Sequence, residues 1–291
     1  MKQINFIATV VLTVVAFFTS YTSHAQTYFK ADVHGKGKPM ILIHGLYCTA
    51  DVWKETVERY KNDYECHVLT LAGFGGNPAN LNDHFLESVK DDLLAYIKAK
   101  DLKKPVLMGH SMGGFISFWA AASAPSVFSK VIAVDGLPFL TVLQMPGATA
   151  EGAKPMATNM RNMMNREQSE EQTEASQKMI LSSMITSPER IALVSAIGKK
   201  SDNKTQGEVM YEMFTTDLRQ NVAAIDCPVL LLGAWIAYKD YGVTHESITA
   251  AYTAQVASVK NAKVEISDTA KHFIFYDEPI WFYDKVDAFL K

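Results

Sequence analysis

The segment Gly109–Gly113, with the sequence GHSMG, places Ser111 between two glycines in the pattern G-x-S-x-G. The apolar run Val106–Gly109 is typical of a buried strand, and the alanine-rich run after Ser111 is typical of a helix. A sharp turn from strand to helix exposes a serine hydroxyl above the edge of a sheet. Glycines flank the serine because side chains would clash in so tight a turn. The helix N-terminus also favours the negative charge that develops beside the serine. The pattern therefore predicts a nucleophilic serine.

A serine hydroxyl becomes an effective nucleophile only when a base takes its proton. His272 follows the last strand-like run, Lys263–Ile266. Serine before histidine is one of the known chain orders for such a pair. We therefore predict that His272 is the base.

These two residues must be positioned by the elements around them. Strand-like runs alternate with segments of helical length and periodicity, which predicts βαβ units and a parallel, buried sheet. The expected strands are Thr27–Val33, Met40–Ile43, Cys66–Leu71, Val106–Gly109, Val131–Asp135, Pro228–Gly233 and Lys263–Ile266, and the expected helices are Asp51–Lys61, Asp83–Lys98, Ser111–Ala124, His245–Val256 and Pro279–Leu290.

The alternation stops between residues 137 and 225. This segment is polar, rich in methionine and helical in pattern, without a strand-like run. We predict a helical cap or lid over residues 137–225, inserted into one α/β domain whose core comprises residues 26–136 and 226–291. Methionine side chains adapt to irregular apolar ligands, and they also fill helical cores.

Several motifs together resemble one known family. His44-Gly45 follows a strand, Gly73-x-Gly75 follows the next, Gly109-x-Ser111-x-Gly113 follows a third, and His272 lies near the C-terminus. With these motifs the chain resembles an α/β-hydrolase-fold serine hydrolase of the capped, esterase- or lipase-like kind, over nearly all of residues 27–291. The resemblance implies a mostly parallel, doubly wound sheet with the helical cap inserted after the sixth strand of the family. It is much less specific for a substrate.

The resemblance also implies an oxyanion hole made of two backbone N–H groups. One belongs to Met112, the residue after the nucleophile, and the other to Leu46, the residue after His44-Gly45. Preorganised donors are needed because the oxygen of the tetrahedral intermediate carries negative charge.

The third member of a catalytic triad is an acid that orients the histidine. Most members of the family place an aspartate three residues after the glycine that closes the strand following the cap. Here that position is Ile236, which cannot orient an imidazole. The next carboxylate is Asp240, and we predict that it is the acid, on a longer loop. Asp135, at the end of the preceding strand, is the alternative, and Asp268 and Asp277 are weaker candidates.

Residues 1–25 have the parts of a signal peptide. Lys2 provides the positive charge, Phe6–Phe18 is an apolar run, and Ser23-His24-Ala25 fits a small-x-small cleavage site. The apolar run is shorter than the roughly 20 residues that a membrane-spanning helix needs. We expect a periplasmic or secreted protein with no stable membrane anchor after cleavage, and an uncleaved N-terminal anchor is the alternative.

Composition and charge limit the classes of protein to which the chain can belong. The 291 residues are 48% hydrophobic, and 28 Lys and Arg balance 31 Asp and Glu for a net charge of −3. This is typical of a folded globular protein and gives no basic field for nucleic acid. Neither a CxxC nor an HExxH pattern occurs. We expect no metal and no organic cofactor, and we expect Cys48, Cys66 and Cys227 to be free thiols.

The sequence therefore predicts an exported serine hydrolase that cleaves a carboxylic ester or related acyl bond through an acyl-enzyme on Ser111. The expected partner is a small, apolar, ester-like molecule. A cofactor-free haloperoxidase or a C–C bond hydrolase on the same scaffold, and a slow-turnover ligand-binding receptor, stay open at this point.

Overall fold

The computed structural model describes residues 28–145, 147–167 and 169–291. The predicted signal peptide, residues 1–25, lies outside them. Within the described ranges no helix combines the length and the apolar character needed to cross a membrane.

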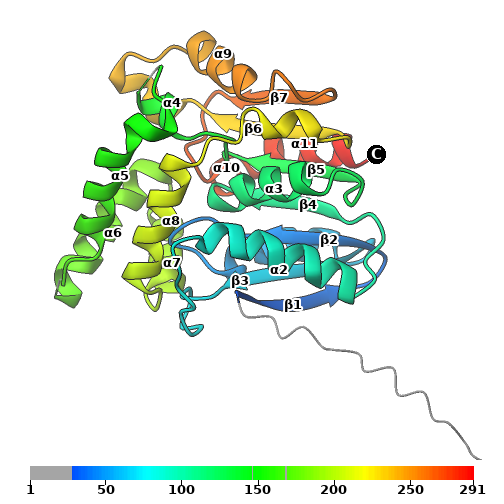
Figure 1. The fold of residues 1–291 in the computed structure, drawn as a ribbon, viewed down its shortest axis with the longest axis horizontal. Helices are drawn as coiled ribbons and strands as arrows, with labels where there is room; N and C mark the ends of the chain where they lie inside the picture. Colours follow the sequence, from blue (N-terminus) through cyan, green and yellow to red (C-terminus); the bar gives the residue numbers. More distant parts are fainter. Residues whose placement is uncertain (1–27, 146, 168) are drawn as a thin grey trace, which may run out of the picture.

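A seven-stranded sheet forms the centre of the molecule, in the order β1-β3-β2-β4-β5-β6-β7 (Figure 1). Only the edge strand β1 is antiparallel to its neighbour, and every other pair is parallel. The predicted, mostly parallel sheet is thus confirmed. Its strands are β1 (Phe29–Gly35), β2 (Lys38–Ile43), β3 (Tyr64–Leu71), β4 (Val106–His110), β5 (Lys130–Val134), β6 (Val229–Ala234) and β7 (Ala262–Ser267).

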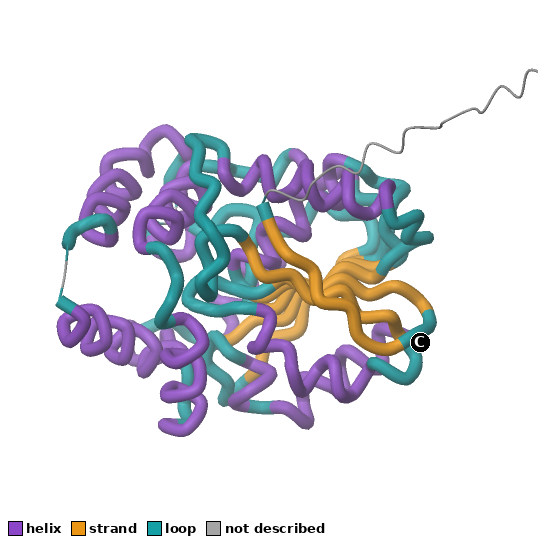
Figure 2. The backbone as a smooth tube through the Cα atoms, turned by 90° about the horizontal axis from the view of Figure 1, so that it is seen from below, coloured by secondary structure: helices purple, strands orange, loops and turns teal. Residues whose placement is uncertain are grey.

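Helices cover both faces of the sheet (Figure 2). Alternate residues of the central strands enter opposite clusters: Ile41 and Ile43 pack in one, and Met40 and Leu42 in the other. This two-sided burial explains why the strands read as continuous apolar runs. The helices and 3₁₀ turns outside the segment between β5 and β6 are η1 (Ala50–Trp53), α1 (Lys54–Tyr60), α2 (Phe85–Ala99), α3 (Met112–Ser123), η3 (Ile236–Tyr241), α9 (His245–Gln255), α10 (Ile274–Asp277) and α11 (Pro279–Leu290).

The described residues between β5 and β6 form helices and no strand. Helices α4 to α8 gather at one end of the sheet, at the left of Figure 1, and α5 packs against α8, whereas the short η2 turn packs against α3. The role of this segment as a cap stays a prediction. Its elements are α4 (Thr141–Gln144), α5 (Ala150–Met164), α6 (Glu170–Met184), α7 (Pro188–Gly198), α8 (Asn203–Thr215) and η2 (Asn221–Ala224).

Backbone hydrogen bonds tie the helical segment to the loop after β3. The Asp202 N–H donates to the Gly73 carbonyl over 2.6 Å, and the Gly76 N–H donates to the Lys200 carbonyl over 3.1 Å. A Cβ on Gly73 would lie 2.5 Å from Oγ1 of Thr205, so the contact needs glycine. The Gly73-x-Gly75 motif is therefore a close junction between the core and the loop that joins α7 to α8.

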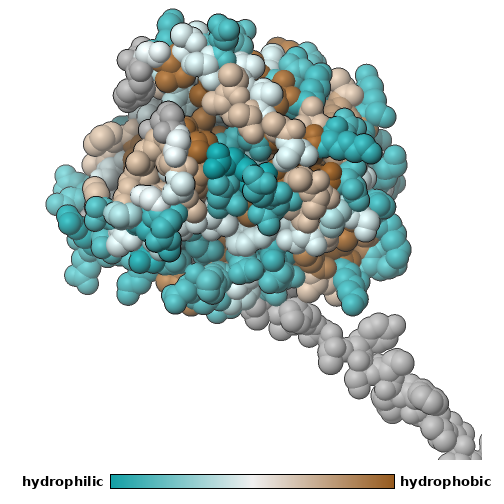
Figure 3. Space-filling model, turned by 45° about the horizontal axis from the view of Figure 1, so that its top comes forward, coloured by the Kyte–Doolittle hydropathy of each residue, from teal (hydrophilic) through white to brown (hydrophobic). Residues whose placement is uncertain are grey.

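The molecular surface is mixed in character. Hydrophilic and apolar residues are interspersed on the face that Figure 3 shows. The most exposed methionines, Met163 at 61% and Met179 at 73%, lie on α5 and α6.

The three cysteines are free and buried, as predicted. Cys48 and Cys66 pack in one core cluster, whereas Cys227 belongs to the cluster on the other face of the sheet. The sheet order separates the strand of Cys66, β3, from β6 by β2, β4 and β5. Each step across a sheet is about 4.8 Å, which places Cys66 and Cys227 far beyond disulfide reach.

A second junction joins α8 to the start of α2. The carboxylate of Glu212 accepts the Leu86 N–H at 3.1 and 3.2 Å and is only 6% exposed as a residue. Burial raises the pKa of Glu212 from its ordinary value of 4.5 to about 8, while backbone N–H groups at the helix start favour the charged form. The folded chain therefore holds a proton here that the unfolded chain releases above about pH 4.5.

Glu212 makes the free energy of unfolding depend on pH. Because its pKa is raised by folding, its contribution is fully present below about pH 4.5 and is lost as the pH rises through about 8. We expect wild type to lose more stability than Glu212→Gln between pH 5 and pH 9, as measured by urea unfolding. Exposed Glu174 on α6 supplies the matched control, Glu174→Gln, which should keep the wild-type pH dependence. Parallel curves for wild type and Glu212→Gln would contradict the expectation.

Candidate active site

Ser111 occupies the turn between β4 and α3. Its backbone has φ 53° and ψ −115°, a left-handed conformation that side chains rarely adopt. Such a residue costs roughly 1–3 kcal/mol and persists only where its surroundings enforce it. Here the Ser111 N–H donates to the Val134 carbonyl over 2.8 Å, and its carbonyl accepts the Phe115 N–H at 3.0 Å. The neighbouring strand and the first turn of α3 thus hold the strained serine.

The glycines around Ser111 are required by close backbone contacts. A Cβ on Gly109 would lie 2.1 Å from the Gly113 carbonyl oxygen, and one on Gly113 would lie 2.2 Å from the Ile43 carbonyl oxygen. Both distances are far below a possible contact, so the strand, the turn and α3 can approach only with glycine at both positions. This is the physical reason for the spacing seen in the sequence.

The loop after β2 lies against the nucleophile turn. A Cβ on Gly45 would be 3.1 Å from Cβ of Ser111. Leu46 and Met112, the two predicted N–H donors, follow Gly45 and Ser111 directly and are 7% and 0% exposed. The structure brings the two backbone segments together, and their role as an oxyanion hole stays a prediction.

His44 fixes the shape of this loop. Its buried ring donates from Nδ1 to the Gly45 carbonyl over 2.8 Å, and Nε2 accepts the Leu71 N–H at 3.1 Å. Burial lowers the pKa of His44 to about 4. A neutral imidazole can donate from one nitrogen and accept at the other, so His44 links the loop to the end of β3.

His272 lies between β7 and α10 and meets a carboxylate. Its Nδ1 is 2.5 Å from Oδ2 of Asp135, whose side chain is 2% exposed. The side chain of His272 is 20% exposed. With the proton on Nδ1 facing the carboxylate, Nε2 carries the lone pair that a general base requires.

The structure places Asp135, the alternative acid, beside His272, and not the predicted Asp240. Asp240 lies in η3, but it is Asp135, directly after β5, whose Oδ2 accepts the hydrogen bond from Nδ1 of His272. The backbone of Asp135 is left-handed, with φ 49°, and its Oδ1 accepts the Ala234 N–H at 3.0 Å. The side chain thus reaches across the end of β6 toward the loop after β7. The left-handed backbone of Asp135 lets its side chain span the strand that separates β5 from β7.

Two further polar side chains join the site, and the sequence analysis did not assign them a role. His110 is buried and donates from Nε2 to the His272 carbonyl over 3.1 Å, and its ring lies 4.6 Å from the His272 ring. Burial holds the pKa of His110 well below its usual range. Tyr252 on α9 donates to Oδ1 of Asp135 over 2.6 Å. The place of His110 inside the serine motif was a signal for it, whereas no local pattern marks Tyr252.

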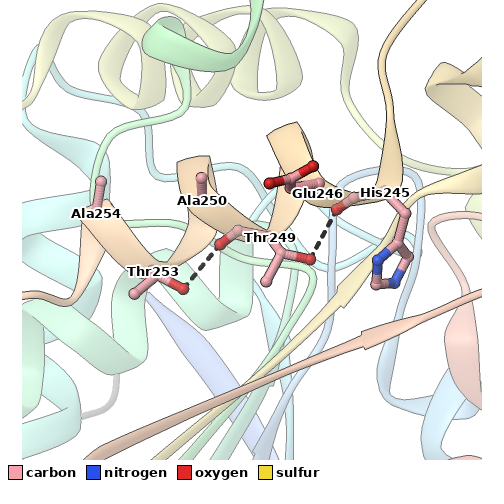
Figure 4. A pocket seen from close by; sticks show the side chains of 6 residues that line it. All are labelled: His245, Glu246, Thr249, Ala250, Thr253 and Ala254. Atoms are coloured by element: carbon pink, nitrogen blue, oxygen red, sulfur yellow. Dashed lines mark hydrogen bonds between the residues drawn. The ribbon is translucent and has the colours of Figure 1, made fainter.

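An open hollow of about 700 Å³ lies elsewhere, along one face of α9 (Figure 4). The hydroxyls of Thr249 and Thr253 there donate to carbonyls of their own helix. These donors are already satisfied, and neither Ser111 nor His272 lines the hollow. Among residues 28–145, 147–167 and 169–291 no group of three His, Cys, Asp or Glu side chains is placed to hold a metal ion.

Comparison with known families identifies the fold of the chain. The sequence profile of the alpha/beta hydrolase fold matches residues 38–279. The chain belongs to this family. The match includes Ser111, His272 and Asp135, so the core and the segment between β5 and β6 fall within one family unit.

Relatives and solved structures within the family are distant. A pimeloyl-[acyl-carrier protein] methyl ester esterase of Aliivibrio salmonicida is 32% identical over 104 residues, 36% of this chain and 38% of that esterase. The methyl ester esterases thus match over well under half of their own length. An (E)-2-((N-methylformamido)methylene)succinate hydrolase of Acinetobacter baylyi is 23% identical over 252 residues, 84% of this chain and 87% of the relative. The esterase EaEST of Exiguobacterium antarcticum has a TM-score of 0.74 at 17% identity and covers 90% of this chain and 94% of its own, which shows the shared fold.

The assignment of the acid is tested by two matched substitutions. Asp135→Asn should lower kcat on a 4-nitrophenyl ester by about 10⁴, because an amide at Oδ2 can donate to Nδ1 and so favours the wrong histidine tautomer. Asp240→Asn should cost far less. Thermal unfolding of both variants checks that folding is kept, and the reverse ranking of the two kcat values would return the acid to Asp240.

Proposed function

We propose that the protein is an exported serine hydrolase that cleaves a carboxylic ester or related acyl bond through an acyl-enzyme on Ser111. The observation that carries the proposal is the strained serine at the β4–α3 turn in a fold that also pairs His272 with Asp135. Membership in the alpha/beta hydrolase fold family supports a hydrolase.

In the proposed reaction, Oγ of Ser111 attacks the acyl carbon while Nε2 of His272 takes the hydroxyl proton. Asp135 stabilises the imidazolium and keeps it oriented. The N–H groups of Leu46 and Met112 stabilise the oxyanion, and one such donor is worth about 10²–10³ in rate. When the intermediate collapses, the proton passes from His272 to the leaving alcohol. Water, activated by His272, then attacks the acyl-enzyme, and the acid and free Ser111 are released.

The proposed substrate is a small molecule with an ester or a related acyl group. The names of the methyl ester esterase and of EaEST support an ester. The name of the Acinetobacter relative describes a substrate with a formamido group, which supports keeping other acyl bonds within the class. A substrate panel should therefore include esters of rising acyl length, a lactone and an N-formyl compound.

Covalent labelling tests the nucleophile. A fluorophosphonate should add to Ser111, because an activated serine attacks phosphorus as it attacks an acyl carbon. Mass spectrometry of the peptide that contains residue 111 measures the adduct. Ser111→Ala and His272→Ala should abolish labelling, and Ser123→Ala at the exposed end of α3 should leave it unchanged. Labelling that survives Ser111→Ala would sink the assignment.

Turnover separates an enzyme from a slow receptor. With a chromogenic ester, a hydrolase keeps releasing product after the first equivalent, whereas a receptor-like protein releases one equivalent per Ser111 and stalls. Sustained release is the expected result. A stall after one equivalent would support formation of an acyl-enzyme but would contradict the proposed catalytic turnover.

Export is the part of the proposal that rests on residues 1–25 alone. Cleavage after Ala25 should give a mature protein that begins at Gln26 in the periplasm or medium of a bacterial host. N-terminal sequencing of the fractionated protein measures this. An Ala25→Arg variant should block cleavage, since the site needs a small residue. Full-length protein in the cytoplasmic fraction would contradict export.

A further inference from the structure

Tyr252 contacts the acid of the proposed triad from a different element. It lies on α9, is 1% exposed and donates its hydroxyl to Oδ1 of Asp135 over 2.6 Å. The ring packs on the backbone of β6, since a Cβ on Gly233 would lie 2.5 Å from Cε1 of Tyr252. The absence of a side chain at residue 233 thus creates the space through which the phenol reaches the carboxylate.

The two oxygens of Asp135 have separate partners. Oδ1 accepts the Ala234 N–H and the Tyr252 hydroxyl, at 3.0 and 2.6 Å, while Oδ2 faces Nδ1 of His272 at 2.5 Å. Rotation of the carboxylate about its Cβ–Cγ bond would break all three contacts. Buried polar networks of this kind rigidify only when every member is satisfied.

We propose that Tyr252 is a positioning residue that acts through Asp135: its hydroxyl holds Oδ1, so that Oδ2 is presented to Nδ1 of His272. The assignment rests on the hydrolase function proposed above. The assignment extends the proposed triad to α9, a helix that carries none of the motifs described above.

The titratable groups described around this network are held in their neutral forms. Burial and the nearby Asp135 carboxylate raise the pKa of Tyr252 well above its ordinary value, so the phenol stays a donor. Burial and Asp135 also raise the pKa of Tyr238, on η3. On the other side of His272 stands His110, whose lowered pKa keeps it neutral. Tyr252, Tyr238 and His110 are therefore expected to keep their uncharged forms at neutral pH.

The first test follows the titration of His272 by NMR in the absence of substrate. Removing the hydroxyl in Tyr252→Phe leaves more of the carboxylate charge on Oδ2, which favours protonated His272. We expect its titration to move upward by about half a pH unit or more. Tyr96→Phe is the matched control, because Tyr96 is also buried and its hydroxyl hydrogen-bonds to Nδ1 of His67 over 2.7 Å. That variant should leave the His272 titration unchanged.

The second test is kinetic. For Tyr252→Phe we expect kcat on the 4-nitrophenyl ester to fall about 10-fold with little change in KM, and the acidic limb of the pH profile to move to higher pH. In an Asp135→Asn background the same substitution should have almost no effect on kcat, because the group through which it acts has been altered. Additive effects of the two substitutions would contradict the proposal.

The outcomes separate this proposal from the proposed function. An unmoved His272 titration in folded Tyr252→Phe overturns the role of Tyr252, whatever the activity. A moved titration in a protein whose Ser111 is not labelled by fluorophosphonate supports the positioning contact and refutes the hydrolase. If circular dichroism shows that Tyr252→Phe is not folded, Gly233→Ala takes its place, because the added methyl group displaces the tyrosine ring and keeps the hydroxyl. For the proposal to stand, Gly233→Ala must then move the His272 titration.

Discussion

The contact between Asp135 and His272 is the interaction on which the arrangement of the site depends. It joins the ends of β5 and β7 across the end of β6, so its geometry depends on the strand order of this sheet. Ala234, the last residue of β6, donates its N–H to the same carboxylate. The strand that separates the two residues is thus also part of what holds them together.

Close backbone approach is the second constraint. The turn at Ser111 needs glycine at residues 109 and 113, and the loop after β2 needs Gly45. Two buried histidines then link these backbone segments: His44 connects the β2 loop to β3, and His110 connects the serine turn to the loop of His272. Burial disfavours the charged form of both rings, which suits them to hydrogen-bonded links rather than to proton transfer.

The helical segment between β5 and β6 contacts loops of the core that lie near Ser111. A Cβ on Gly198, the last residue of α7, would lie 2.2 Å from the Tyr47 carbonyl oxygen, so α7 contacts the loop that carries Leu46. Glu212 of α8 meets the first turn of α2, and Asp202 meets Gly73. A displacement of these helices would therefore act directly on the loops around Ser111.

The features that could be predicted from the residues alone are those that depend on local geometry. The turn at Ser111 and the parallel strands follow from short-range steric and hydrophobic patterns, and His272 was predicted from its place after the last strand and from chain order. The structure has the Ser111 turn, the sheet and His272 at these predicted places. Which carboxylate meets His272 depends on how the strands and loops pack. Chain spacing favoured Asp240, but a left-handed backbone at Asp135 and the small residues at the end of β6 let a side chain cross a strand. Tyr252 was equally invisible in the sequence, because its hydroxyl meets Asp135 only after α9 packs on β6. Such contacts join residues far apart in the chain, and no local period or motif encodes them.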